Sequence, residues 1–160
     1  MISVRQERER GFSLIEVLVS LGLLAGVMVA VSSLFIFGGK EVKSGKKMTE
    51  AYSVGHDIVE EMDRMTYTQA YQYFLPSGTD TSTATNYTVN TKTSPAPVSD
   101  YQSNIDSKLY NGQATINVEA LDASGNAVGF DLCVALRISV TVQWDEGTQT
   151  RYLNLRTVRF

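Results

Sequence analysis

The side chains that could perform nucleophilic or metal-centred chemistry are few in this 160-residue sequence, which contains one histidine and one cysteine. His56 has Asp57 beside it and Glu60 nearby, but no further ligands follow at a metal-binding spacing. Cys133 lies in an apolar stretch without a nearby base, and a lone cysteine forms no internal disulfide. The sequence therefore predicts no enzyme, no metal site and no cofactor, and we expect a solvated or packed His56 and a buried structural Cys133.

The charge balance argues against direct binding of nucleic acid. The sequence has 14 Lys+Arg against 17 Asp+Glu, a formal net charge of −3, and no basic stripe. Its mean hydropathy is near zero only because one very apolar segment is averaged with a long polar remainder. No residue pattern indicates a small-molecule substrate, and an enzyme would need paired acids in a deep pocket, which this sequence does not reveal.

Glu16 is the one charged residue of an otherwise apolar segment from Phe12 to Phe37. The part from Val17 to Phe37 has 21 residues without a charge, enough for a helix to span a hydrocarbon layer of about 30 Å. We interpret it as a membrane segment. A carboxylate in a bilayer costs about 2.5–3.5 kcal/mol at the helix centre and less near an end. Glu16 therefore needs a partner.

Two ordinary explanations of this segment are incomplete. A secretory signal peptide has a shorter apolar region and a small-residue cleavage site after it, and no clear site of that kind follows here. A signal anchor fits the length but leaves Glu16 unexplained.

Residues 11–16 (GFSLIE) resemble the processing site of type IV prepilins and pseudopilins. The resemblance implies that a prepilin peptidase cuts between Gly11 and Phe12, that Phe12 is then N-methylated, and that residues 1–11 are a leader. It also implies that Glu16, the fifth residue of the mature chain, meets the α-amino group of a neighbouring subunit. Two opposite charges in a low-dielectric bundle attract strongly, so such a pair can set the register of one helix against the next.

Two further features of the apolar segment bear on helix packing. Gly22 and Gly26 have the G-x-x-x-G spacing that allows close helix contact in lipid, although glycine is common in membrane helices generally. Major pilins often carry a proline where this chain has Ser33, and its absence favours a minor subunit.

The topology is indicated by the resemblance and not by charge. Lys40, Lys43, Lys46 and Lys47 follow the apolar segment with only Glu41 to oppose them, whereas residues 1–11 offer three arginines. The positive-inside rule therefore does not place the N-terminus in the cytoplasm. The resemblance implies a cytoplasmic leader, a single pass through a bacterial inner membrane, a periplasmic head, and later a pilus or pseudopilus.

The helical pattern continues past the membrane segment. Residues at helical spacing form an apolar face, namely Met48, Tyr52, Gly55, Ile58 or Val59, Met62 and Met65. One helix is predicted from about Phe12 to a point between Arg64 and Leu75. We assign residues 12–39 to the membrane and filament-core helix and 40–160 to the rest of this helix and a globular head.

The remainder of the sequence predicts a loop and then a sheet. Residues 66–100 read as a long irregular loop with short strands, in which Tyr67, Tyr71 and Tyr73 pack on the helix or form an aromatic patch. Alternating apolar residues predict strands over 114–121, 136–144 and 149–158, with Trp144 as a core anchor. The expected fold is α+β and pilin-like, with a long N-terminal helix packed on a C-terminal antiparallel sheet.

These features together predict a minor type IV pilin, which primes or modifies a pilus. The ending at 140–160 is similar to PilV-type minor pilins and to I-type pseudopilins of type II secretion. The implied partners are the prepilin peptidase, other minor and major pilins, and an inner-membrane assembly platform. A pseudopilin of type II secretion, a competence pilin that contacts DNA through partners, and a single-pass anchored binding module stay open as alternatives.

Overall fold

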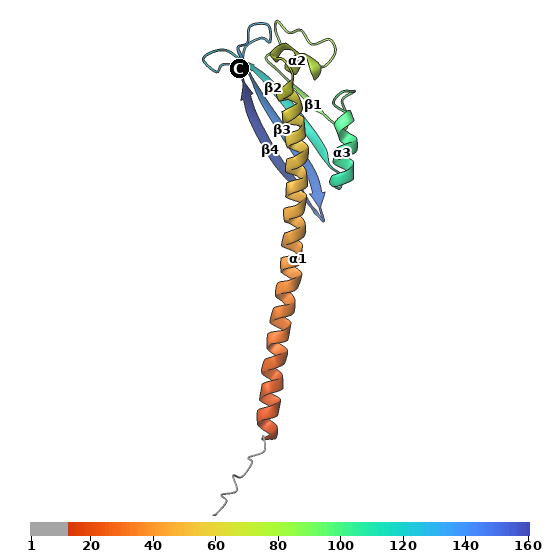
Figure 1. The fold of residues 1–160 in the computed structure, drawn as a ribbon, viewed down its shortest axis with the longest axis vertical. Coiled ribbons are helices and arrows are strands. Elements are labelled where there is room, and N and C mark those ends of the chain that lie inside the picture. Colours follow the sequence, from red (N-terminus) through yellow and green to blue (C-terminus); the bar gives the residue numbers. More distant parts are fainter. Residues whose placement is uncertain (1–12) are drawn as a thin grey trace, which may run out of the picture. The chain divides into compact units, whose positions relative to one another are not determined.

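A computed structural model describes residues 13–160 of the chain (Figure 1). In chain order the elements are α1 (Leu14–Arg64), α2 (Tyr67–Tyr73), β1 (Asn86–Asn90), α3 (Asp100–Lys108), β2 (Gln113–Leu121), β3 (Ala135–Glu146) and β4 (Gln149–Arg159). The chain divides into two compact units, one that ends at Lys43 and one from Ser44 to Phe160, which we call the head unit. The predicted α+β class, a long N-terminal helix with a C-terminal antiparallel sheet, is confirmed.

The head unit is built on a four-stranded sheet in the order β1-β2-β3-β4, with each strand antiparallel to the next. Apolar residues alternate along β2 and β3, so every second side chain enters the core. Ile116 of β2 pairs with Val140 of β3, and both are fully buried. Trp144 is 2% exposed, which confirms it as a core residue. The three predicted strands are present, with ends shifted by at most two residues.

The last part of α1 packs on this sheet. It buries five residues that recur at spacings of three and four, as one face of a helix requires: Ala51, Val54, Gly55, Ile58 and Met62. α1 ends at Arg64, at the near end of the predicted range. Arg159 of β4 donates from its guanidinium to the carbonyl oxygens of Met62 and Met65 at the helix end, where backbone carbonyls run out of helical partners, and the Met62 carbonyl also accepts from the Met65 N–H.

The predicted apolar face of this helix is partly wrong. Met48 is 46% exposed and Tyr52 is 49% exposed, so neither belongs to the core. The residues that approach the sheet there are Ala51 and Gly55, and both are buried. Gly55 belongs to the predicted face, whereas Ala51 and Val54 are not part of it. Small residues such as Ala51 and Gly55 are what allow a helix to come close to a sheet.

The prediction of an irregular loop over 66–100 is wrong in part. The short strand β1 agrees with the prediction, whereas α2 and the start of α3 at the end of the segment are not predicted. Thr66 caps α2 by accepting a hydrogen bond from the Gln69 backbone N–H, while the Gln69 side chain accepts from the Thr66 N–H. This capping box is visible in the sequence as a threonine followed three residues later by a glutamine. The spacing of Tyr101, Ile105 and Leu109 is the corresponding signal for α3.

Candidate functional site

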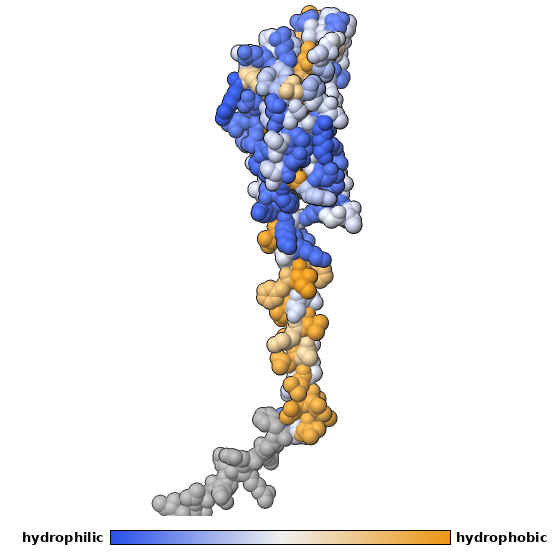
Figure 2. All heavy atoms as spheres, turned by 90° about the vertical axis from the view of Figure 1, so that its right-hand side faces the viewer, coloured by the Kyte–Doolittle hydropathy of each residue, from blue (hydrophilic) through white to orange (hydrophobic). Residues whose placement is uncertain are grey.

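The apolar part of α1 is the largest uncovered apolar surface in the described chain. Its side chains from Leu14 to Phe37 are exposed almost throughout; among the larger ones Leu14 and Phe35 are each 78% exposed. Figure 2 shows this stretch as apolar, in contrast to the hydrophilic surface of the head unit. Within residues 13–160 this is the one helix long and apolar enough to cross a membrane.

Three serine hydroxyls within this stretch are satisfied inside the helix. The hydroxyls of Ser20, Ser32 and Ser33 donate to the backbone carbonyls four residues earlier, at 2.7, 2.8 and 2.9 Å. Such bonds are required where no water is available, because an unpaired hydroxyl in hydrocarbon carries a desolvation cost. The serines are therefore compatible with a lipid environment.

Glu16 lies in the first turn of α1 and is exposed. Within residues 13–160 it forms no ion pair. Gly22 and Gly26 are one helical turn apart, and a β-carbon on either would meet nothing within 4 Å. All three positions are thus open to a partner outside the chain. The predicted cleavage and methylation positions, Gly11 and Phe12, lie outside the described residues.

The single histidine and the single cysteine take part in packing. The ring of His56 is exposed and stacks on Tyr52, with a centroid distance of 5.8 Å. Cys133 is half-buried; the Tyr67 hydroxyl donates to its sulfur at 2.7 Å, and the thiol donates to the Phe130 carbonyl at 3.0 Å. The pKa of the Tyr67 hydroxyl is raised, mainly because the group is partly buried and to a smaller extent because of its hydrogen bond with Cys133. Residues 13–160 contain no group of three or more acidic, histidine or cysteine ligands that could hold a metal.

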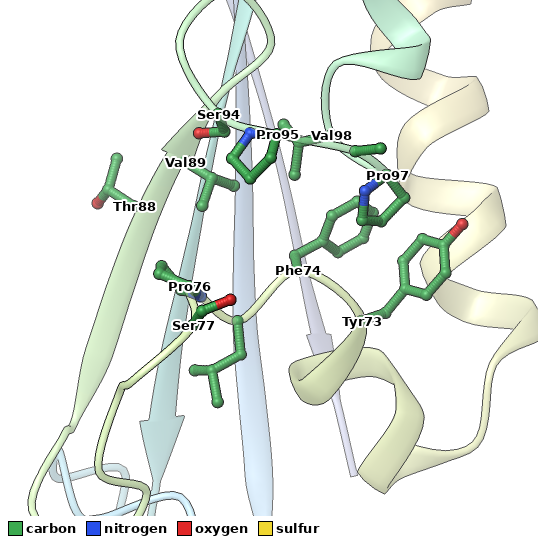
Figure 3. A pocket seen from close by; sticks show the side chains of 12 residues that line it. Tyr73, Phe74, Pro76, Ser77, Thr88, Val89, Ser94, Pro95, Pro97 and Val98 are labelled. Atoms are coloured by element: carbon green, nitrogen blue, oxygen red, sulfur yellow. The ribbon is translucent and has the colours of Figure 1, made fainter.

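The three tyrosines of α2 do not share one role: two pack in or against the core, and one is exposed. Tyr71 is buried and Tyr67 packs against the core, whereas Tyr73 is 42% exposed. Tyr73 lines a pocket of about 150 Å³ together with residues 74–77, 88–89 and 94–98 (Figure 3). Its lining contains aromatic, proline and hydroxyl side chains and no charged residue. The lining of this pocket therefore contains no pair of acids.

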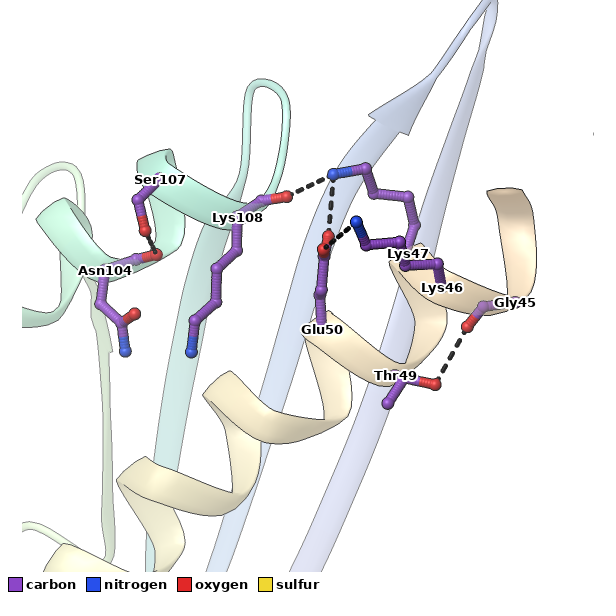
Figure 4. Close-up of polar contacts among 8 residues, drawn as sticks. All are labelled: Gly45, Lys46, Lys47, Thr49, Glu50, Asn104, Ser107 and Lys108. Carbon is purple, nitrogen blue, oxygen red and sulfur yellow. Dashed lines mark hydrogen bonds and ion pairs between the residues drawn. The ribbon is translucent and has the colours of Figure 1, made fainter. Parts of the chain in front are cut away.

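A second surface lies where α1 enters the head unit, beside the end of α3. Lys47 Nζ donates to Glu50 Oε2 at 2.8 Å and to the Lys108 carbonyl at 2.6 Å, and Lys46 Nζ is 3.8 Å from the same carboxylate (Figure 4). Lys46, Glu50 and Lys108, with Thr49 and Ser53, line an open groove of about 340 Å³. The hydrogen bond from Lys47 lowers the pKa of Glu50.

Sequence reasoning does not single out Lys108, because 61 residues separate it from Lys47 and only the packing of α3 beside α1 brings the two together. The chain matches no protein-family profile, no curated protein and no solved structure.

Proposed function

We propose that this chain is a minor type IV pilin, a structural subunit that primes or modifies a pilus after cleavage and N-methylation at Phe12. The observation that carries the proposal is one helix with two roles. Its first part presents uncovered apolar side chains around a single carboxylate, Glu16, and its last part is the core helix of an α+β head. A simple membrane anchor has no need for that carboxylate.

In this proposal the apolar part of α1 first lies in the inner membrane, with the head in the periplasm. An assembly platform then moves it from lipid into a bundle formed by the helices of other pilins. This exchange keeps the apolar side chains away from water throughout. Glu16 pairs in the bundle with the α-amino group of a neighbouring subunit, which compensates the cost of a buried carboxylate.

Gly22 and Gly26 support the same proposal. Because a β-carbon at either position would meet nothing, the chain itself has no packing need for glycine there. A neighbouring helix that approaches this face closely would have such a need.

The experiment that tests the proposal is the mass and N-terminal sequence of the mature protein, from strains with and without prepilin peptidase. We expect a peptidase-dependent chain that begins with N-methylated Phe12. An intact leader in both strains would contradict the proposal and leave an anchored binding module as the better account.

A pseudopilin of type II secretion would give the same N-terminus. It is distinguished by deleting each assembly platform in turn and measuring which deletion removes the chain from the sheared filament fraction. Loss with the pilus platform alone is the expected result, and loss with the secretion platform alone would contradict the assignment to a pilus.

A further inference from the structure

The lysines of this chain are unevenly distributed. The chain has six, and Lys40, Lys43, Lys46 and Lys47 follow the apolar segment within eight residues. The other two, Lys92 and Lys108, come from distant parts of the sequence but lie at the end of the head unit where α1 enters it. Every lysine therefore lies either in the segment that follows the apolar segment or at the end of the head unit where α1 enters it.

Contacts within the head unit establish this gathering. Lys108 is joined to Lys47 through its carbonyl oxygen. Lys92 Nζ donates to Asn111 Oδ1 at 2.9 Å, and Asn111 in turn donates to Asp145 Oδ2 at 2.7 Å. Asp145 lies at the end of β3, and the next residue, Glu146, accepts a hydrogen bond from Ser44, the first residue of the head unit.

These lysines are available to a partner. The side chain of Lys46 is 75% exposed, that of Lys47 is 40% exposed and that of Lys108 is 32% exposed. Lys92 is exposed as well. Tyr110, two residues after Lys108, is 77% exposed although it is aromatic, and its carbonyl accepts from the Asp145 N–H. We call Lys46, Lys47, Lys92, Lys108 and Tyr110 the lysine end.

The sign of the charge differs between this end and the rest of the head. Around the lysine end, its four lysines and Arg151 face four carboxylates, those of Glu50, Asp57, Asp145 and Glu146, and Lys108 Nζ lies 4.0 Å from Asp57 Oδ2. The remainder of the head unit carries four basic and nine acidic side chains. The head is thus positive at the end where α1 enters and negative elsewhere, which orients it in an electric field.

We propose that the lysine end docks on the anionic phospholipid headgroups of the membrane that the apolar part of α1 spans. Ser44 follows Phe37 by seven residues, so the covalent chain keeps this end close to the bilayer surface. Lysines with flexible apolar stems and an exposed tyrosine are typical of membrane–water interfaces. Each lysine near an anionic surface favours docking about fivefold. The inference depends on the membrane insertion in the proposed function, but not on cleavage or filament assembly.

The test uses the full chain in nanodiscs of phosphatidylglycerol or of phosphatidylcholine, with Cys133→Ser as the background. A fluorophore is attached at Ser107→Cys, on α3 beside the lysine end, and its quenching by headgroup-labelled lipid is measured. We expect quenching several-fold stronger in phosphatidylglycerol, and a fall to the phosphatidylcholine level in 0.5 M salt because salt screens surface charge. A second fluorophore at Ser124→Cys, in the turn after β2 at the other end of the sheet, is expected to show no such difference.

Paired variants test the lysines themselves. Lys46→Gln with Lys92→Gln removes two exposed charges and should lower the docked-to-undocked ratio about 25-fold. Arg64→Gln with Arg156→Gln removes two charges elsewhere in the head and should leave the docked-to-undocked ratio unchanged. Lys46→Arg with Lys92→Arg keeps both charges and should preserve docking.

Equal quenching in the two lipids, or no effect of the double glutamine variant, would overturn the docking proposal alone. Failure of the chain to enter either nanodisc would overturn the membrane insertion in the proposed function as well.

Discussion

Gly55 of α1 faces Leu155 of β4 so closely that a β-carbon on Gly55 would lie 2.6 Å from Leu155 Cδ1. The same β-carbon would lie 3.3 Å from Val142 Cγ2 on β3. Glycine at this position therefore lets the helix pack against two neighbouring strands. A larger side chain must push the helix away or displace both.

The first prediction is that Gly55→Leu lowers the free energy of unfolding of the head by about 1–3 kcal/mol, because it overpacks this contact. Thermal unfolding of the full chain, followed by circular dichroism in detergent, measures the effect. Gly45→Ala is the matched control: no atom lies within 4 Å of its β-carbon, so the better helix propensity should raise stability by up to about 1 kcal/mol. An equal change in the free energy of unfolding for the two substitutions would contradict the close contact between Gly55 and Leu155.

The second prediction concerns the buried hydroxyl of Tyr87, which donates to the Tyr71 carbonyl at 3.0 Å and so joins β1 to α2. Tyr87→Phe leaves that carbonyl without its partner and should cost about 1 kcal/mol of stability. Tyr152→Phe, at a residue that is 74% exposed, should have no measurable effect in the same unfolding assay. An unchanged stability of Tyr87→Phe would show that water replaces the bond.

The third prediction concerns pH. The hydrogen bond from Lys47 lowers the pKa of Glu50 in the folded state below its ordinary value of 4.5. The pair therefore stabilises the head above the unfolded pKa, and this contribution is lost as the pH falls through the folded value. We expect the thermal midpoints of the native chain and of Glu50→Gln to converge on acidification from about pH 6 to about pH 3. In Lys47→Met, the pKa of Glu50 measured by NMR should rise towards 4.5; a pKa that stays low would show that Lys47 is not its main cause.

The fourth prediction separates processing from assembly. Glu16→Gln keeps the shape of the side chain but removes its charge, so the chain should still be cleaved and methylated. Its amount in sheared filaments should fall more than tenfold, because loss of one partner of a buried ion pair costs about 3–5 kcal/mol. Glu41→Gln removes a carboxylate beyond the apolar segment and should leave incorporation unchanged. Normal incorporation of Glu16→Gln would contradict a role for this residue in subunit registration.

The apolar helix and the three C-terminal strands could be predicted from the sequence because each depends on a local pattern. An uncharged run of spanning length needs an apolar surrounding wherever it lies, and alternation along β3 buries one face whatever partner covers it. The resemblance of residues 11–16 to a prepilin processing site rests on a local pattern as well. By itself, the sequence therefore determined the α+β class and the bounds of a helix apolar and long enough to cross a membrane.

The tertiary structure decided which residues of different elements meet. Whether Tyr52 or Ala51 faces the sheet depends on how close α1 comes to β3 and β4, and that distance is set by Gly55 and Leu155 together. The gathering of Lys92 and Lys108 near Lys47 depends on where α3 packs, which no local pattern encodes. Local periodicity reports which side of an element is buried, whereas contacts between elements arise only when all of them share one core.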